Sequence, residues 1–246
     1  MTKTLILIPS RMAATRLPGK PLLKINNLSI ISHVFKRAEE ANIGEVVVAA
    51  ADQEIVEDVL KNGGKAILTN NNHKTGTDRI FEAYKKLDIK NVDYILNLQG
   101  DEPNINKDDI INLNNFMINH DVELGTLAAK IQDKKILDNK NVVKVITNKK
   151  LVESNFPKAL NFTRDNLSID SQNIYHHIGI YSYKISVLEK FVSLDQTSNE
   201  KKNKLEQLRA IDNKLKINVA LAKSSPIGVD TEEDYLAIKK IMEYKI

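Results

Sequence analysis

Short apolar runs alternate with amphipathic helical patterns through residues 5–98, and this alternation limits the possible folds more than any other feature. The apolar runs lie at 5–9, 46–50, 65–68 and 94–98. They lack the every-second-residue polarity of a strand with one wet face, so they suit parallel strands covered by helices on both faces. The intervening patterns predict helices at about 30–42, at 55–62 and from Thr77. Strand, helix and strand in this order predict right-handed crossovers and an α/β fold with a doubly wound, mostly parallel sheet.

The second half of the chain continues with less regular spacing. Expected strands lie at 125–130, 142–147, 160–163, 178–183 and 216–222. Expected helices lie at 107–119, 185–192, 199–213 and 231–244, and the third of these is a single charged amphipathic helix. No internal repeat or linker interrupts the chain, so residues 1–246 are expected to form one domain.

Composition excludes several classes of protein. The chain has no cysteine, which fits a reducing compartment, and no apolar stretch approaches the roughly 20 residues of a membrane span. Its net charge is +4, but the lysines are interleaved with acids and no tryptophan is present, so nucleic-acid binding is disfavoured. The first apolar run ends at Pro9 without the features of a signal peptide, and a cytoplasmic location is therefore expected.

The loop after the first run carries three cations, Arg11, Arg16 and Lys20. Pro18 and Pro21 flank Lys20 and fix the path of this loop. Ligands of open α/β sheets bind outside the carboxyl ends of the strands, so the loop points at an anionic ligand. Arginine forks and a mobile lysine suit several phosphate oxygens at once.

Two carboxylates, Asp101 and Asp230, follow other expected strands. The crossover logic places Asp101 at the same sheet edge as Lys20, although Gly100 and Asp101 also fit a plain turn. Converging aspartates offer oxygen ligands to Mg²⁺, and together with the cations they predict a nucleoside triphosphate site. P-loop, dinucleotide-binding, zinc-peptidase and hydrolase motifs are absent from the sequence.

Six motifs in order carry a resemblance that spans nearly the whole chain. They are Arg11-Met-Ala-Ala-Thr-Arg16-Leu-Pro-Gly-Lys20-Pro-Leu, Thr75-Gly-Thr-Asp-Arg79, Asn97-Leu-Gln-Gly-Asp101-Glu-Pro, His177-Ile-Gly-Ile-Tyr181, Leu205-Glu-Gln-Leu-Arg209 and Gly228-Val-Asp230-Thr. In these motifs the chain closely resembles the 3-deoxy-manno-octulosonate cytidylyltransferases, or CMP-Kdo synthetases. The resemblance implies a nucleotide-diphospho-sugar transferase (Rossmann-like) fold with a small sugar-binding and dimerisation lobe.

The resemblance also implies a reaction and a set of roles. CTP and the eight-carbon acidic sugar Kdo would give CMP-Kdo and pyrophosphate for lipopolysaccharide synthesis, in a homodimer that uses Mg²⁺. The residues implied to bind the nucleotide are Pro9, Ser10, Arg11, Arg16, Lys20, Gly76 and Gln99, and those implied to act in catalysis are Lys20, Arg11, Asp101 and Asp230. The two aspartates would hold the metal. The residues implied to face the sugar are Arg164, His177, Tyr181, Glu206 and Gln207, with Arg164 at the carboxylate.

One segment departs from the family pattern. The usual Ser-Arg-x-x-Ile-Pro stretch reads Thr163-Arg164-Asp165-Asn166-Leu167-Ser168 here. A cytidylyltransferase for another acidic sugar, such as 8-amino-Kdo or a nonulosonate, is therefore an alternative. Two further alternatives are a non-catalytic nucleotide-binding protein and a glycosyltransferase on the same fold. Neither of them needs two carboxylates beside three cations.

Overall fold

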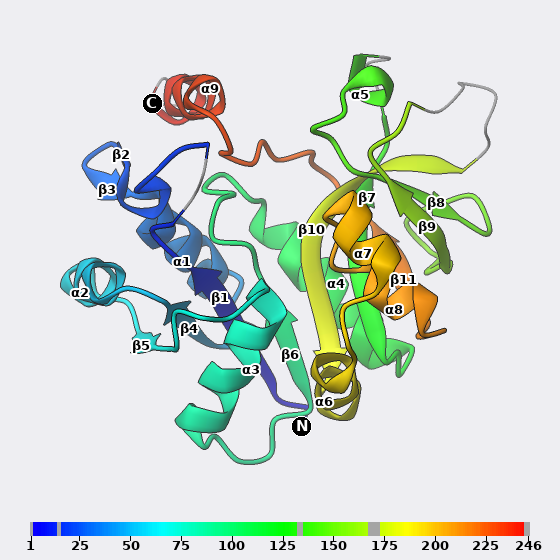
Figure 1. The fold of residues 1–246 in the computed structure, drawn as a ribbon, viewed down its shortest axis with the longest axis horizontal. Coiled ribbons are helices and arrows are strands. Elements are labelled where there is room, and N and C mark those ends of the chain that lie inside the picture. The colour runs from blue at the N-terminus through cyan, green and yellow to red at the C-terminus, as the bar shows by residue number, and fades with distance from the viewer. Residues whose placement is uncertain (1, 14–15, 132–134, 167–172, 244–246) are drawn as a thin grey trace. The chain divides into compact units, whose positions relative to one another are not determined.

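The computed structural model describes residues 2–13, 16–131, 135–166 and 173–243 (Figure 1). They form two compact units, unit 1 (Met1–Ile110 with Pro226–Ile246) and unit 2 (Ile111–Ser225). The expectation of one domain over residues 1–246 stays a prediction. Within the described ranges, no helix is long and apolar enough to cross a membrane.

Unit 1 contains a parallel sheet. Its strands are β1 (Thr4–Ser10), β4 (Gly44–Ala50), β5 (Ala66–Leu68) and β6 (Tyr94–Asn97). β1 pairs with β4 on one side and β6 on the other, and β4 pairs with β5. Leu5 to Ile8 are all buried, which explains why this run lacks alternation. The predicted parallel strands of the first half are confirmed.

Helices α1 (Ile30–Glu40), α2 (Gln53–Lys61) and α3 (Gly76–Leu87) connect these strands. The chain moves in one direction across the sheet through α1 and α2 and returns through α3, so right-handed crossovers place α3 on the opposite face (Figure 1). Ser29 and Thr75 cap α1 and α3 through their hydroxyl oxygens. The caps fix where both helices begin.

Three small elements and the last helix complete unit 1. They are the 3₁₀ turn η1 (Lys20–Leu22), the hairpin of β2 (Lys24–Ile25) and β3 (Leu28–Ser29), and α9 (Glu232–Glu243). A buried cluster of Ile25, Ile30, Val229 and Ile238 packs α9 against the hairpin. This packing holds the segment before α9 beside the loop that follows β1.

Unit 2 contains mixed strand pairing. Its strands are β7 (Leu124–Ala129), β8 (Lys144–Thr147), β9 (Ala159–Thr163), β10 (Ile174–Lys184) and β11 (Asn218–Leu221). β10 is antiparallel to β7 and β8, β9 is antiparallel to β8, and β11 is parallel to β7. Its helices are α4 (Lys107–Asn119), which begins at the end of unit 1, α5 (Lys135–Asp138), α6 (Ile185–Ser193), α7 (Ser198–Asn203) and α8 (Leu208–Asp212). β10 begins four residues before the expected strand at Ile178.

The expectation of one helix over residues 199–213 is wrong. α7 ends at Asn203, Lys204 has φ of 52°, and α8 begins at Leu208. A buried ion pair joins Arg209 Nη2 to Glu200 Oε1 at 2.7 Å. Nine residues of continuous helix would separate the two residues by about 13.5 Å along the axis, so the chain has to fold back.

Candidate active site

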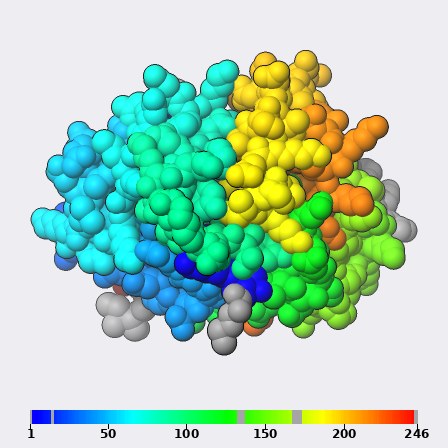
Figure 2. Space-filling model, turned by 90° about the horizontal axis from the view of Figure 1, so that it is seen from below, coloured from blue at the N-terminus to red at the C-terminus, as the bar shows by residue number. Residues whose placement is uncertain are grey.

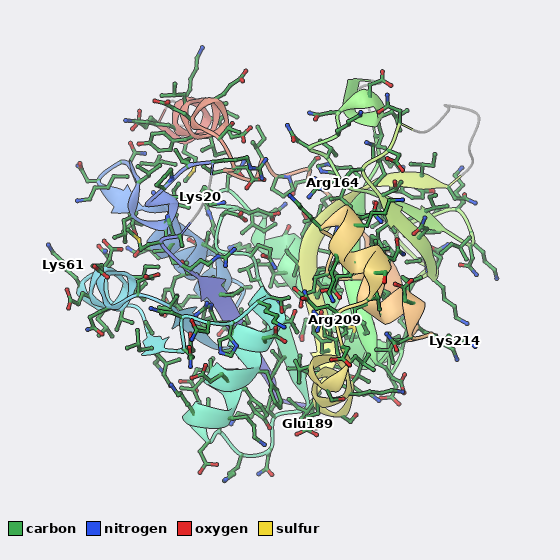
Figure 3. All side chains as sticks on the ribbon, viewed as in Figure 1. Lys20, Lys61, Arg164, Glu189, Arg209 and Lys214 are labelled. Atoms are coloured by element: carbon green, nitrogen blue, oxygen red, sulfur yellow. The ribbon has the colours of Figure 1, made fainter. Side chains whose placement is uncertain are left out.

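The predicted phosphate loop and the two predicted carboxylates come together in unit 1. Lys20 Nζ lies 2.8 Å from Asp101 Oδ2 and 3.3 Å from Asp230 Oδ1. Arg16 Nη2 contacts the other oxygen of Asp230 at 2.9 Å. β1 and β6 are adjacent and parallel, so the loops that leave them meet at one sheet edge. Lys20 is labelled in Figure 3.

Backbone contacts hold the two aspartates in place. The Val229 amide donates to the Asp101 carbonyl oxygen at 2.9 Å, which ties the two loops together. At the start of α9, the Asp234 carboxylate accepts from the amides of Asp230 and Thr231. The Asp234 amide donates in return to the Thr231 hydroxyl. Asp230 is therefore positioned by a helix cap rather than by a free loop.

Charge is closely balanced around Lys20. Burial alone would lower the pKa of Lys20, but the carboxylates of Asp101 and Asp230 outweigh it and raise that pKa. Glu102 is buried beside the same carboxylates, and burial, then Asp101, then Asp230 raise its pKa to about 8. Its Oε2 has no hydrogen-bond partner in the described part of the chain. Sequence reasoning missed Glu102 as a site residue, although it directly follows Asp101.

Pro9, Gly76 and Gly100 meet at the carboxyl end of β1. A Cβ on Gly76 would lie 3.2 Å from Pro9 Cγ, and one on Gly100 would lie 2.9 Å from the Pro9 carbonyl oxygen. The approach at Gly100 leaves no room for a Cβ against the backbone, and the one at Gly76 is tighter than an ordinary Cβ contact. Ser10 Oγ is buried and, among the described residues, has no hydrogen-bond partner. Gln99 follows β6 and is partly exposed. Pro9, Ser10, Gly76 and Gln99 keep their predicted nucleotide roles as predictions.

Arg79 is a site residue that sequence reasoning quoted in a motif without assigning a role. It is 3% exposed, and its Nη1 donates to Thr69 Oγ1 at 2.7 Å and to the Asn70 carbonyl oxygen at 3.0 Å. Burial and the nearby positive charge of Arg11 lower its pKa. Two guanidinium groups close together favour an anion beside them. The sequence feature that could have pointed to Arg79 is its position one helical turn after Gly76 on α3.

Glu82, one turn further along α3, holds the loop that leads to Gly76. Its carboxylate accepts from the Asn70 amide at 2.9 Å and contacts His73 Nε2 and Lys86 Nζ. Burial would raise its pKa, but the hydrogen bonds of Lys86, His73 and Asn70 lower it to about 2. The loop is therefore tied to the helix by a carboxylate that stays ionised at neutral pH.

The residues predicted to face the sugar lie in unit 2, and several of them are close together. The rings of His177 and Tyr181 have centroids 5.5 Å apart. Burial, then Tyr183 and the charge of Glu206 raise the pKa of Tyr181 well above its usual value, which shows that Glu206 lies near it. In the described part of the chain, the buried Tyr181 hydroxyl has no hydrogen-bond partner. Gln207 follows Glu206 and is 8% exposed.

His177 is neutral at ordinary pH. Burial, then the charges of His176 and Arg164, lower its pKa to about 3. Its Nε2 lies 3.1 Å from Thr126 Oγ1, and the Thr126 hydroxyl donates to the Ile180 carbonyl oxygen at 2.7 Å. Because that hydroxyl has one hydrogen, Nε2 of His177 is the donor to it. Nδ1 is then the acceptor nitrogen of the ring.

Arg164 follows β9 and contacts the turn after α5. Its Nη1 donates to the Asn141 carbonyl oxygen at 2.6 Å. The buried Lys144 donates to the carbonyl oxygens of Arg164, at 3.1 Å, and Asn139, at 3.0 Å. Sequence reasoning missed Lys144. The altered positions 167 and 168 after Arg164 lie outside the described residues.

Asp101 and Asp230 are the residues of unit 1 that fit a divalent cation. Within the described ranges, no group of three or more His, Cys, Asp or Glu side chains could hold a metal ion. Mg²⁺ is commonly bound through one or two carboxylates together with substrate phosphates. The two aspartates already converge on one cation, Lys20 Nζ, and therefore fit such a site.

Comparison with known proteins agrees with this geometry. Residues 5–217 match the model of the cytidylyltransferase family. The chain is 43% identical over 244 residues to a 3-deoxy-manno-octulosonate cytidylyltransferase of Rhodopseudomonas palustris (strain BisB18), covering 99% of both chains.

Solved structures extend the comparison to the fold. CMP:2-keto-3-deoxy-manno-octonic acid synthetase complexed with CTP has a TM-score of 0.89 and 33% identity, with full coverage of both chains. UDP-glucose pyrophosphorylase complexed with UDP-glucose has a TM-score of 0.74, 13% identity and full coverage of both chains, a likeness in fold alone. The predicted nucleotide-diphospho-sugar transferase fold is therefore confirmed. The chain belongs to the cytidylyltransferase family, among the 3-deoxy-manno-octulosonate cytidylyltransferases.

Proposed function

We propose that the chain transfers CMP from CTP to the anomeric hydroxyl of Kdo and releases pyrophosphate. The observation that carries this proposal is the cluster of Lys20, Asp101 and Asp230 at the carboxyl end of β1 and β6. A cation held between two carboxylates beside Arg16 is suited to a triphosphate, because each group can exchange its protein partner for a ligand oxygen or a metal ion. The product supplies lipopolysaccharide synthesis, as the family resemblance implies.

The transfer requires little covalent chemistry from the protein. The anomeric oxygen attacks the α-phosphorus in line, the hydroxyl loses its proton, and the bond from the α-phosphorus to the bridging oxygen of pyrophosphate breaks. Arg11, Arg16 and Lys20 balance the charge that develops on the leaving pyrophosphate. Pro9, Ser10, Gly76 and Gln99 surround the cytidine, and their contribution is orientation.

Asp101 and Asp230 would hold Mg²⁺ in this reaction. When bound, the ion offsets phosphate charge and orients the triphosphate. Lys20 would then turn from the carboxylates toward the phosphates. The flexible four-carbon stem of lysine permits such a change of partner without movement of the backbone.

Arg164, His177, Tyr181, Glu206 and Gln207 face the sugar acid in this proposal. Arg164 pairs with the carboxylate, because a guanidinium group offers two parallel donors to two oxygens. The acceptor Nδ1 of His177, the Tyr181 hydroxyl and the Glu206 carboxylate suit the hydroxyl groups of a sugar.

Another acidic sugar is the second candidate substrate. The observation that favours it is the departure from the family pattern over residues 163–168, directly around Arg164. Such a substrate would keep the nucleotide residues and change the contacts in unit 2.

Pyrophosphate release from CTP with magnesium tests both substrates and the non-catalytic alternative. The reaction is run with Kdo, with 8-amino-Kdo, with N-acetylneuraminate and without sugar. Turnover with Kdo alone is expected. Turnover with a different sugar acid would reassign the sugar, and CTP binding without any turnover would favour a non-catalytic protein.

We further propose a homodimer in the cytoplasm, where CTP is made. Two apolar side chains of unit 2, Leu160 and Val152, are 56% and 37% exposed, which fits a surface that is covered by a second copy. Sedimentation equilibrium of the wild type and of Leu160→Asp tests the dimer. We expect the wild type to be dimeric and the variant to dissociate more readily, whereas a monomeric wild type would contradict the proposal.

A further inference from the structure

The chain that contains Glu206 and Gln207 is a bend between two very short helices. α7 has six residues and α8 has five. Helices of this length are not stable alone in water. Tertiary contacts therefore have to hold the bend and the two polar side chains in it.

One such contact is the ion pair of Glu200 and Arg209. Arg209 Nε donates to Glu200 Oε2 at 2.9 Å and Nη2 donates to Oε1 at 2.7 Å, a bidentate pair. The side chains are 4% and 2% exposed, so solvent screens the pair little. Figure 2 shows the segment from α6 to α7 (yellow) at the surface, whereas the side chains of the pair are buried.

Glu200 is itself fixed by the start of α7. Its backbone amide donates to the Thr197 hydroxyl, and its carboxylate accepts from the Thr197 amide, which together form a capping box. The Thr197 hydroxyl donates to Asp212 in α8 at 2.5 Å, which joins the two helices a second time. The cap and the ion pair therefore act on the same carboxylate.

Arg209 is also held by a contact with α6. Its guanidinium carbon lies 4.6 Å from the ring centroid of Phe191 in α6. The row continues from Phe191 to Tyr183 at 5.9 Å and from Tyr183 to Tyr181 at 6.1 Å. Arg209, labelled in Figure 3, thus contacts both the bend and an aromatic row that includes Tyr181.

We infer that the Glu200 and Arg209 pair is a positioning device for sugar binding. The pair holds Glu206 and Gln207 in the bend. The inference rests on the proposed function, in which these two residues face the sugar acid. The Arg209 amide donates to the Glu206 carbonyl oxygen at 3.0 Å, and the Leu205 amide donates to the Glu200 carbonyl oxygen at 3.3 Å. A displacement of either charged residue therefore moves the bend directly.

Arg209→Lys tests the inference, because lysine keeps the charge but cannot form the bidentate pair. We expect the KM for Kdo to rise at least tenfold while the KM for CTP stays within twofold. Leu188→Ala, a buried substitution in α6, is the control for a general loss of stability, and its thermal melting is recorded beside that of Arg209→Lys. An unchanged KM for Kdo, or an equal rise for both substrates in both variants, would overturn the inference.

A double-mutant cycle separates positioning from a merely structural role. If Arg209 acts through Glu206 and Gln207, Arg209→Lys adds less than twofold to the KM for Kdo when both of those residues are alanine. If Arg209→Lys instead raises the KM for Kdo by the same factor with and without the two alanine substitutions, the inference is overturned. Should Arg209→Lys fail to fold, Glu200→Gln carries the same test, because glutamine retains the cap but not the charge.

The measurements on the wild type and on Arg209→Lys distinguish a failure of the proposed function from a failure of the inference. A wild-type protein that does not turn over Kdo contradicts the proposed function. A wild type that turns over Kdo, with a KM for Kdo that Arg209→Lys leaves unchanged, overturns the positioning inference alone.

Discussion

Lys20 joins residues that are far apart in the sequence, since its ammonium group contacts Asp101 and Asp230. Lys20→Ala removes a charge-assisted contact worth roughly 1.5–3 kcal/mol. If the contact is made in the transition state, kcat falls about ten- to a hundredfold. Steady-state pyrophosphate release measures this. Lys61→Ala, on the exposed surface of α2, is the matched control and should retain full activity (Figure 3). Near-normal turnover of Lys20→Ala would contradict its catalytic role.

Asp101 has a different part in the same cluster. Asp101→Ala is expected to reduce turnover further than Lys20→Ala, because it removes a proposed metal ligand as well as the partner of a lysine that is only 14% exposed. The comparison is kcat of both variants at saturating magnesium and CTP. Equal loss in the two variants would argue that Asp101 serves only to hold Lys20.

His177 makes stability depend on pH in a definite direction. Its pKa is about 3 in the folded protein and near 6.5 in an unfolded chain. Between these values the unfolded state binds more protons, so the free energy of unfolding falls as pH falls from 6.5 toward 3, by a few kcal/mol in total. Urea unfolding of wild type and His177→Gln at pH 7 and pH 4.5 measures the difference.

The expected result is a smaller loss of stability in His177→Gln than in the wild type. His120→Gln, at an exposed position, is the control and should lose as much stability as the wild type. If His177→Gln loses as much as the wild type over this range, the histidine is not buried in its neutral form.

At the scale of elements, Lys204 decides between one helix and two. Its φ of 52° costs an L residue roughly 1–2 kcal/mol, and glycine avoids this cost. Lys204→Gly is therefore expected to raise the free energy of unfolding by up to about 1 kcal/mol. In a continuous helix the same change would lower it by about 1 kcal/mol. Chemical denaturation gives the sign of the change in the free energy of unfolding. Lys202→Gly, inside α7, is the control that is expected to be destabilising.

The elements that sequence reasoning predicted well are those with local causes. α1 follows from its apolar spacing and the Ser29 cap, and α4 has the predicted bounds of 107–119. The split of α7 and α8 has a tertiary cause, because the Glu200 and Arg209 pair forms only when the chain folds back. The β2 and β3 hairpin had a local signal that was not used: Asn26 and Asn27 both have positive φ, as a tight two-residue turn requires.

In the site, too, some contacts could be predicted from the sequence and others could not. The meeting of Lys20 and Asp101 could be predicted, because adjacent parallel strands end at one edge. The contacts of Arg79 and Glu82 could not, because their partners include backbone atoms of Asn70, whose position no side-chain pattern reveals. Their role in holding the loop before Gly76 became visible only in three dimensions.

At the scale of the whole molecule, unit 1 is completed by the end of the chain. Lys20 and Asp230 are 210 positions apart, and the segment Pro226–Ile246 returns to the unit formed by the first 110 residues. The charged cluster therefore cannot form until nearly all of the chain has been made. Such non-local contacts are typically slow to form during folding.

The same cluster predicts how the molecule responds to removal of metal. Lys20 and Arg16 supply the carboxylates of Asp101 and Asp230 with positively charged partners from the chain itself, so we expect the fold not to depend on a metal cation at this site. EDTA is therefore expected to abolish pyrophosphate release while leaving the melting temperature of the nucleotide-free protein unchanged within about 1 °C. Added CTP should stabilise the protein more with magnesium than with EDTA, because a ligand that binds only the folded state raises stability by mass action, about 2.7 kcal/mol at a hundredfold excess over Kd. Differential scanning calorimetry of the four combinations tests this, and a melting temperature that EDTA lowers by several degrees without CTP would show instead that a bound metal supports the fold.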